Sequence, residues 1–470
     1  MARSLGPDGP LQGASPGRAG EIPARCAVLM ANLMGERTRM SPKVLIVGAG
    51  QSGLYFGHQL LNQGVDVTLI TGQTSTEIRN GRTSITQFSM PFTRALEEQA
   101  KLDLWQDSAP RFDRVNMSLR PDEGPAVQFY GSLGSSQFAS RVGGHAVSVD
   151  RRVKMADWLE HFEDNGGRVV IHGITESDLA FFVGRGMYDL VVIAVGAGEL
   201  GALFDPDPTR FSGAHDRVAT QVMLHDVAWE DSTSADVYSI NGGEVFFIPV
   251  LTDEGPATSI TMLANPGALL DASGIRGRSA GAVLERMQEV LRQHLPDVYE
   301  RFSGATVDDL VGGAKNGVNS AIQTQFRPGV RNPVGWMAGK PVLGMADVVV
   351  TSDPVSGQGW NNSTYCAQVY ADAFAAHRGA YDEAFMAAAF ERFWIERGQH
   401  SAVFSEMVDG FWGGALPEHF GELIGAVMTN QTVADRWIGG FDDPADYARW
   451  MFDPAAARAY LAEAGAIPPR

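Results

Sequence analysis

The chain has 470 residues, of which 44% are hydrophobic, so it can bury a large core and is long enough for two closely joined domains. Its formal net charge of −18 argues against nucleic acid or an anionic membrane surface as a partner, because both require a basic face. Two cysteines exclude a disulfide framework and a zinc cluster, which favours the reducing cytoplasm, and no apolar run approaches the roughly 20 residues of a membrane span.

Residues 1–40 differ in composition from the rest of the chain. Segment 1–24 is rich in Gly, Pro, Ala and Ser, which is typical of disorder. The short apolar run that follows lacks a convincing cleavage site, which argues against a signal peptide. We expect a disordered leader, with several methionines as alternative start sites: Met1, Met30, Met34 and Met40.

The first predicted strand is the apolar run Lys43–Val47, and a GxGxxG pattern follows it directly, at Gly48, Gly50 and Gly53. The first glycine permits a tight turn, the second lets the backbone approach a pyrophosphate, and the third lets helix and strand pack closely. A helix-like segment, Leu54–Gln63, comes next, so the pattern predicts a dinucleotide site with the diphosphate at the helix N-terminus.

The second strand, Val65–Thr71, completes the βαβ unit but lacks the acidic tip that often binds a ribose 2′-hydroxyl. Thr71 stands in that place, which weakens an NAD interpretation, although its hydroxyl can still bond to a ribose. Arg82 follows in a polar turn, where it could clamp a diphosphate; a solvated loop arginine is an equal alternative.

A second glycine pattern, Gly196–Gly201, follows the predicted buried strand Tyr188–Val195. No further strand with an acidic tip comes after it. We therefore interpret it as a glycine-rich strand end close to the first cofactor, and not as a second nucleotide site.

Residues 205–340 are rich in predicted strands separated by turn signals. We expect an antiparallel sheet inserted into the nucleotide domain, since such a sheet can cover a reactive ring and line a pocket. The expected pocket walls are Ser84–Pro91, the strands of 220–262 and Val318–Phe326.

The chain then returns to the nucleotide domain. Asp347 stands at a strand end, where it can bind sugar hydroxyls, and the turn Asp353–Gly359 (DPVSGQG) feeds a helix over Trp360–His377. Such a turn aims backbone N–H groups and the positive end of a helix dipole at a ring, and would suit the negative pyrimidine side of a reduced flavin. Residues 380–470 are helical and aromatic, and we expect them to pack onto the body.

Together these elements resemble the flavoprotein monooxygenases of the p-hydroxybenzoate hydroxylase fold. The resemblance rests on the glycines of Gly48–Gly53, on Arg82, and on Ala346-Asp347 leading to DPVSGQG. Within that fold the chain is most similar to the styrene/indole monooxygenase family, on the runs DVTLIT and VLGMAD…SDPVSGQG and on a helical tail of similar length after Gly379.

The resemblance implies an α/β fold with a Rossmann-like FAD-binding domain of the GR2 type, an inserted antiparallel substrate domain and a helical C-terminal region. The implied segments are the leader 1–40, FAD-binding parts 41–204 and 341–379, the substrate-binding domain 205–340 and the helical region 380–470.

Members of this family bind FAD and accept reduced flavin from a separate NAD(P)H-dependent flavin reductase. By resemblance, oxygen would add at flavin C4a, and the hydroperoxide would transfer one oxygen atom to a small apolar or aromatic substrate, by epoxidation or hydroxylation of the styrene or indole type. The implied protein is cytoplasmic, with no metal, nucleic acid or membrane partner, and a homodimer is left open.

Site residues follow from the resemblance position by position. The predicted catalytic positions lie against the flavin ring: Pro354, Gly357, Gln358 and Gly359. The predicted cofactor-binding positions are Gly48, Gly50, Gln51, Ser52, Gly53, Thr71, Arg82, Arg152, Gly196, Asp347, Pro354, Gly359 and Asn361.

The chain departs from the family pattern at three positions. Ala346 replaces the usual Gly before the Asp. Ile85 and Ser89 stand where styrene epoxidases carry Asn and His, which puts styrene itself in doubt as the substrate.

Two other functions stay open. A single-component NAD(P)H-dependent hydroxylase of the same fold would need a nicotinamide groove and the Asp-Gly segment typical of those enzymes, which is not evident here. A non-catalytic flavin-binding protein, such as a carrier or sensor, is compatible with the acidic surface and the large β insertion. A flavin halogenase is disfavoured, because its WxWxIP signature is absent.

Overall fold

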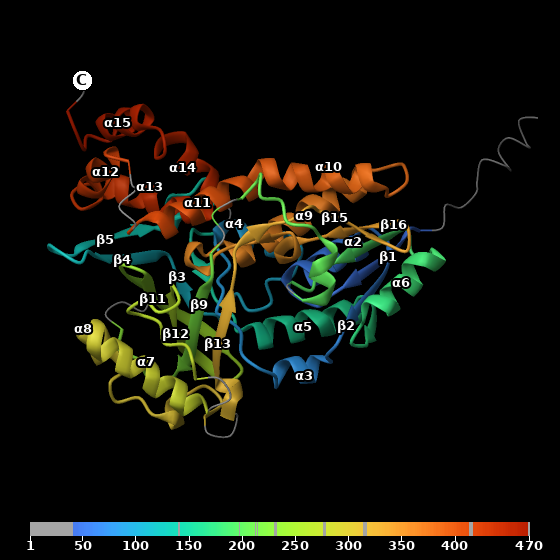
Figure 1. The fold of residues 1–470 in the computed structure, drawn as a ribbon, viewed down its shortest axis with the longest axis horizontal. Helices are drawn as coiled ribbons and strands as arrows, with labels where there is room; N and C mark the ends of the chain where they lie inside the picture. Colours follow the sequence, from blue (N-terminus) through green and yellow to red (C-terminus); the bar gives the residue numbers. More distant parts are fainter. Residues whose placement is uncertain are drawn as a thin grey trace, which may run out of the picture. The chain divides into compact units, whose positions relative to one another are not determined.

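A six-stranded sheet in the order β15-β16-β8-β1-β2-β7 forms the nucleotide-binding end of the protein (Figure 1). Its strands are β1 (Lys43–Val47), β2 (Asp66–Thr71), β7 (Arg168–Ile171), β8 (Leu190–Ile193), β15 (Val334–Met337) and β16 (Lys340–Gly344). All neighbours pair in parallel except the β15–β16 hairpin. Strands β1 and β8 are runs of buried branched residues, as strands covered on both faces require.

The computed structural model describes residues 41–468, apart from 140–141, 197, 212, 214, 230–232, 276–278, 314–316 and 413–416. Residues Pro42–Arg470 form one unit. The leader predicted for residues 1–40, with its alternative start sites, lies outside the described residues.

Two helices that lie far apart in the sequence pack side by side on the parallel sheet: α2 (Gln51–Asn62) and α9 (Gln358–Ala376). Gln51 Nε2 donates to Thr364 Oγ1 at 2.9 Å, and Tyr55 Oη donates to Gln368 Oε1 at 2.7 Å, each pair being 313 residues apart. The two glycine-containing turns that precede these helices are therefore held at the same edge of the sheet. A third helix, α5 (Arg151–Asp164), packs beside α2, where Phe162 contacts His58. Helix α6 (Glu176–Arg185) contacts β15 at the edge of the sheet.

A second, seven-stranded sheet has the order β13-β9-β12-β11-β10-β4-β5. Its strands are β4 (Arg114–Arg120), β5 (Val127–Ser132), β9 (Arg217–Leu224), β10 (Ser234–Ile240), β11 (Gly243–Thr252), β12 (Gly255–Ala264) and β13 (Ala321–Phe326). The sequence predicted this sheet as antiparallel and within 205–340. The sheet is in fact mixed, because β4 pairs in parallel with β10. It also extends beyond 205–340, because the β4–β5 hairpin comes from earlier in the chain.

The two faces of this sheet bury different helices, because side chains alternate along each strand. Val245 and Phe247 share a core with α7 (Ala280–His294). Ile248 and its neighbours on the opposite face share a core with the C-terminal helices. Figure 1 shows α7 on one side of the sheet and α11 to α15 on the other.

The C-terminal region is helical, as predicted. It contains α10 (Glu383–Phe393), α11 (Gln399–Gly410), α12 (His419–Val427), α13 (Gln431–Asp442), α14 (Pro444–Trp450) and α15 (Pro454–Glu463). The remaining short elements are α3 (Ser75–Arg79), α4 (Pro91–Gln99), α8 (Pro296–Tyr299), β3 (Arg111–Phe112), β6 (Ala146–Val147), β14 (Gly329–Val330) and β17 (Val350–Thr351). Among the described residues, no helix combines the length and the apolar character that crossing a bilayer demands.

Candidate active site

A pocket of about 900 Å³ opens at the carboxyl ends of the parallel strands β1, β2 and β8. Ligands of open α/β sheets bind at this edge. Most of the residues predicted from the sequence line it: Gly48, Gly50, Gln51, Ser52, Thr71, Arg82, Arg152, Gly196, Asp347, Pro354 and Gly359. We call this the wide pocket.

The glycine pattern after β1 divides into structural and pocket-facing positions. Gly48 has φ +118°, and a Cβ there would lie 2.5 Å from the Ala194 carbonyl oxygen. A Cβ on Gly53 would collide with the carbonyl oxygen of Gly48. Gly50 differs, because a Cβ on it would point into the wide pocket, with Arg151 Nη2 at 4.0 Å as its nearest neighbour. The open face at Gly50 is where an extended group can approach the backbone closely.

Helix α2 begins at this loop with Gly50 as its N-cap, and no side chain caps its first turn. The first helical residues, Gln51 and Ser52, both line the wide pocket. Uncapped N–H groups at a helix start, together with the positive end of the helix dipole, attract an anion such as a diphosphate. The loop and helix therefore fit the diphosphate of a dinucleotide.

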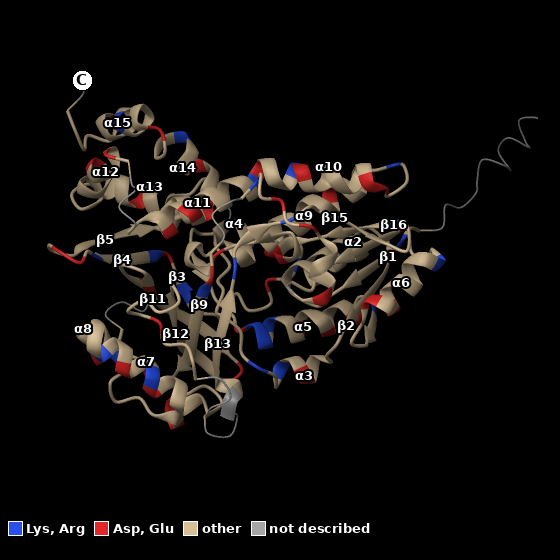
Figure 2. Cartoon of the chain, viewed as in Figure 1, with Lys and Arg blue, Asp and Glu red and all other residues tan. Residues whose placement is uncertain are grey.

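Three arginines lie along the wide pocket. Arg82 is exposed, whereas Arg152 is buried and gives its Nε–H to Asp150 Oδ2 at 2.9 Å. Arg151, which the sequence analysis missed, is exposed at the pocket and attracts the charge of Asp347. Figure 2 shows basic residues at the start of α5, where both Arg151 and Arg152 lie. Their position at the first turn of a predicted helix beside the sheet edge was the available signal.

Asp347 lies in a short 3-10 helix (Ala346–Val348) just after β16, exposed to the wide pocket. The surrounding protein nevertheless desolvates its carboxyl group, which raises the pKa to about 6, while the positive charge of Arg151 opposes that rise. Ala346 has φ +55°, a left-handed conformation that a glycine adopts without strain. Ala346 therefore adopts the backbone conformation expected of the glycine that usually precedes this aspartate in the family.

The turn before α9 stands between two cavities. Asp353 caps it by accepting the Val355 N–H at 2.9 Å, and Gly357 has φ +64°. Pro354 and Gly359 line the wide pocket, whereas Pro354 and Gly357 line a second, smaller cavity. A ring placed against this turn would have the start of α9 on one side.

Two predicted positions, Gln358 and Asn361, line neither cavity and are fully buried. Gln358 Nε2 donates to the Phe441 carbonyl oxygen at 2.7 Å. Asn361 Oδ1 accepts from the Met90 N–H at 3.1 Å and from Thr93 Oγ1 at 2.6 Å. These side chains hold neighbouring segments against the turn. Direct contact of either side chain with a cofactor stays a prediction that the geometry does not favour.

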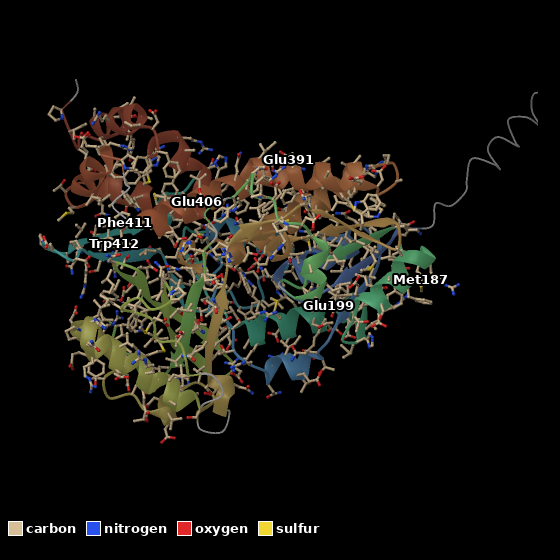
Figure 3. All side chains as sticks on the ribbon, viewed as in Figure 1. Met187, Glu199, Glu391, Glu406, Phe411 and Trp412 are labelled. Carbon is tan, nitrogen blue, oxygen red and sulfur yellow. The ribbon has the colours of Figure 1, made fainter. Side chains whose placement is uncertain are left out.

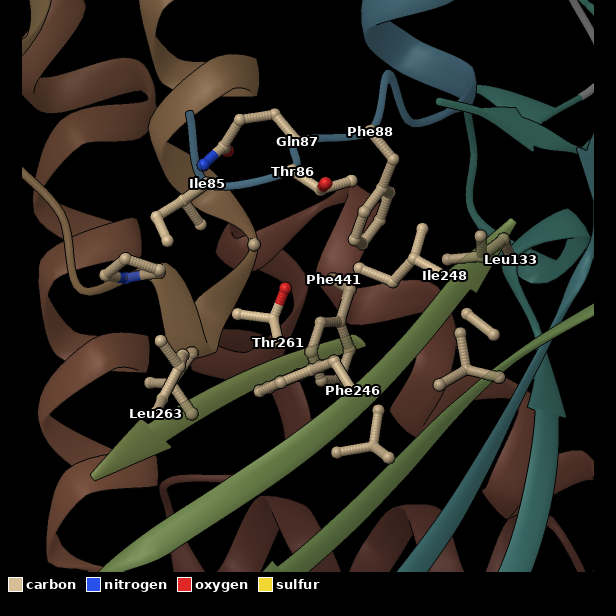
Figure 4. Close-up of a pocket in the computed structure, with 16 residues that line it drawn as sticks. Ile85, Thr86, Gln87, Phe88, Leu133, Phe246, Ile248, Thr261, Leu263 and Phe441 are labelled. Carbon is tan, nitrogen blue, oxygen red and sulfur yellow. The ribbon is translucent and has the colours of Figure 1, made fainter. Parts of the chain in front are cut away.

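The smaller cavity has a volume of about 40 Å³ and is almost entirely apolar (Figure 4). We call it the proximal cavity. The predicted wall Ser84–Pro91 supplies Ile85–Phe88, and β10, β11 and β12 supply another wall. Three further lining residues were not predicted from the sequence: Val115 of β4, Leu133 directly after β5, and Phe441 of α13.

Other expected wall residues lie elsewhere. Ile322 and Phe326 of β13 line the wide pocket and not the proximal cavity. Ser89 is buried away from both cavities and donates its hydroxyl to Glu97. Ile85 lines both cavities, so of the two departures from the styrene epoxidase pattern only Ile85 faces them.

Two family models match the chain. One, described as an FAD binding domain, covers residues 41–96, and the other, described as "Styrene monooxygenase A putative substrate binding domain", covers residues 196–301. Styrene monooxygenase StyA of Pseudomonas fluorescens is 26% identical over 409 residues, which span 86% of this chain and 94% of that protein. The chain is therefore similar to styrene monooxygenases over most of its length. StyA of a Pseudomonas species is also 26% identical, over 412 residues with the same coverage.

Solved structures share the fold at low identity. A flavoprotein/dehydrogenase from Cytophaga hutchinsonii has a TM-score of 0.61 at 13% identity and covers 90% of this chain and 100% of its own. The flavin-dependent brominase Bmp2 has a TM-score of 0.60 at 14% identity, covering 91% and 100%. These likenesses confirm the predicted fold class. The family models and the StyA relatives confirm FAD as cofactor and a flavin-dependent monooxygenase as the class of enzyme.

Proposed function

We propose that this styrene monooxygenase-like protein takes reduced FAD from a separate NAD(P)H-dependent flavin reductase and inserts one oxygen atom into a small apolar aromatic substrate. One observation carries the proposal: the wide pocket and the proximal cavity meet at a single turn, where Pro354 lines both. Ile85 and Gln87 line both cavities as well. A ring at this junction would have its diphosphate side in one cavity and a substrate in the other.

The residues of the wide pocket fit FAD in three parts. Gly50 and the start of α2 suit the diphosphate, and Asp347 can accept hydroxyl groups of a sugar chain. The turn Pro354–Gly357 and the start of α9 suit the ring, because N–H groups and a positive dipole favour negative charge on a reduced flavin. Bound reduced FAD supplies the activation of molecular oxygen, and these residues bind and orient it.

The proximal cavity supplies the dry environment that oxygen transfer requires. Its walls are apolar apart from a few groups, and two of these are occupied: the Thr86 N–H and Thr261 Oγ1 both donate to Gln221 Oε1, at 2.6 and 2.8 Å. The hydroxyl group of Thr86 is buried without a partner among the described residues. It is available to orient a polar edge of an otherwise apolar substrate.

The position of the second glycine pattern supports delivery of the flavin by a separate protein. Gly196 and Gly198 line the same wide pocket as Gly48, and a five-residue 3-10 helix (Glu199–Leu203) follows them. This segment therefore belongs to the first cofactor site and offers no second βαβ unit for a nicotinamide nucleotide. The free, buried Cys366 is compatible with the reducing cytoplasm that we propose as the location.

The deciding experiment mixes the purified protein with chemically reduced FAD, oxygen and one of three substrates, namely indole, a styrene or a thioether. We expect oxygenated product without any binding of NAD(P)H by this chain. A product that forms only when NADPH is added to the protein alone would favour a single-component hydroxylase. Saturable FAD binding without product from any substrate would favour a flavin carrier, and no uptake of oxidised or reduced FAD would overturn the proposal.

A further inference from the structure

A second apolar cavity of about 50 Å³ lies next to the proximal cavity. We call it the distal cavity. The two share four lining residues, Val237, Phe246, Val355 and Phe441. They are therefore neighbouring compartments, separated by side chains and not by backbone layers.

Strand register explains how the two cavities are related. One row of side chains crosses four neighbouring strands on the sheet face beneath both cavities. It consists of Thr261 on β12, Phe246 on β11, Val237 on β10 and Met117 on β4. The neighbouring row, two residues further along each strand, is Leu263, Glu244, Ser239 and Leu119. Rows on one face are about 7 Å apart, so the distal cavity continues the proximal one by roughly one row.

Two aromatic side chains, Phe246 and Phe441, stand at the boundary between the cavities. Both are only partly buried and line both cavities, so each ring has free space beside it. The backbone of Phe441 is fixed, because Gln358 Nε2 donates to its carbonyl oxygen. With this backbone held, the two compartments would join through rotation of the Phe246 and Phe441 side chains.

The far end of the distal cavity is polar, unlike its walls. Ser239 and Glu244 line it in the row beyond Phe246. Glu244 accepts from Arg217 Nη2 at 2.7 Å, but Arg217 also faces Asp353 at 3.3 Å and Asp409 at 3.4 Å. One guanidinium facing three carboxyl groups leaves this end electronegative. Trp412, two residues after α11, donates its indole N–H to Ser239 Oγ at 2.8 Å. Its neighbour Phe411 lines the distal cavity, and Figure 3 labels both residues.

We propose that the distal cavity is the outer part of the substrate site and takes the side arm of an elongated arene, with a nitrogen donor such as an amine at the tip of the arm, near Ser239 and Glu244. The inference rests on the proposed function, since it places the reacting arene in the proximal cavity. At about 40 and 50 Å³, neither cavity alone has room for an arene with a long side chain, and movement of the Phe246 and Phe441 side chains would join the two into one longer site.

The test measures binding to the purified protein by calorimetry, with three probes: ethylbenzene, butylbenzene and 4-phenylbutylamine. Met407 lines only the distal cavity, so Met407→Trp fills it without touching the proximal one. The same change at the exposed Met428 is the matched control. We expect Met407→Trp to lower the affinity for butylbenzene and 4-phenylbutylamine by about tenfold or more, because their extra methylene groups lose their apolar site. Ethylbenzene should bind this variant within about twofold of the wild type.

Glu244→Gln tests the polar end and keeps an acceptor for Arg217. This variant should bind 4-phenylbutylamine about tenfold more weakly, which is the loss expected when a charge-assisted hydrogen bond is removed. Its affinity for butylbenzene should be unchanged. Equal affinity of Met407→Trp and wild type for the long probes overturns the inference, as does an equal loss for all three probes. If ethylbenzene fails to bind the wild type and no oxygenated product forms, the proposed function fails instead.

Discussion

Arg217 Nε lies 3.3 Å from Asp353 Oδ2, so a buried guanidinium supports the residue that caps the turn carrying Pro354. Only 2% of the Arg217 side chain is exposed, and Glu244 and Asp409 contact it from other elements. Burial raises the pKa of Glu244 to about 7 and that of Asp353 to about 6, and it also raises the pKa of Asp409. With one cation for three carboxyl groups, this cluster holds a proton close to neutral pH.

The cluster predicts a stability that falls as the pH rises. An unfolded glutamate has a pKa of about 4.3, so between that value and 7 the folded protein binds more protons at Glu244 than the unfolded chain does. The free energy of unfolding should therefore decrease as the pH rises from 5 to 7 and level off above that range. Glu244→Gln, which cannot ionise, should flatten this slope in urea unfolding series at several pH values.

The matched control for that measurement is Glu163→Gln, at the exposed end of α5. It should keep the wild-type slope. His215 lies 3.6 Å from Asp409, so His215→Gln should be measured alongside. Identical slopes in wild type and Glu244→Gln would show that the cluster is not the source.

A second prediction separates the roles of the glycines after β1. In Gly50→Ala the φ of −88° suits alanine and the new Cβ points into the wide pocket, so the protein should fold normally. FAD affinity should fall by about tenfold or more, because the methyl group occupies the space through which a diphosphate approaches the backbone. Fluorescence titration with FAD and thermal unfolding measure the two effects.

Gly48→Ala is the contrasting variant. Its Cβ would press on the Ala194 carbonyl oxygen at a φ of +118°, so it should lose about 2 kcal/mol or more of stability. Normal FAD binding by Gly50→Ala would contradict the placement of the diphosphate at this loop.

The parts of the site that the sequence predicted are those where local backbone chemistry decides the shape. Gly48, Gly53 and Gly357 occupy positions that reject a side chain or need a positive φ, and such positions leave a readable pattern. Helix periodicity also carries information that the sequence analysis did not use. Gly359 and Ser363 are one turn apart on α9 and both line the wide pocket, whereas Gln358 lies on another face.

Long-range pairing left no such pattern. The parallel β4–β10 pair joins residues about 120 positions apart, and nothing in either strand specifies the other. For the same reason Phe441 in the proximal cavity and Arg217 beneath the turn were not foreseen: each reaches its place through the packing of separate elements. A buried arginine among apolar strand residues was the one available hint.

A third prediction concerns the left-handed residue before Asp347. Ala346→Gly should stabilise the protein by up to about 1 kcal/mol, because relief of the left-handed strain outweighs the entropy that a glycine gains in the unfolded chain. Ala338→Gly, at φ +48° in the β15–β16 turn, should do the same away from the wide pocket. Only Ala346→Gly can also change FAD affinity. A loss of stability in Ala346→Gly alone would mean that its methyl contacts outweigh the strain.

A fourth prediction uses the one unpartnered hydroxyl of the proximal cavity among the described residues, that of Thr86. Thr86→Val keeps the shape and removes the acceptor, so it should raise KM for indole by about tenfold, since the indole N–H loses its partner. KM for a styrene, which has no donor, should stay within about twofold. Thr86→Ser keeps a hydroxyl group and should restore the indole value. Equal losses for both substrates would instead indicate that Thr86 shapes the cavity wall, with no part in orienting the substrate.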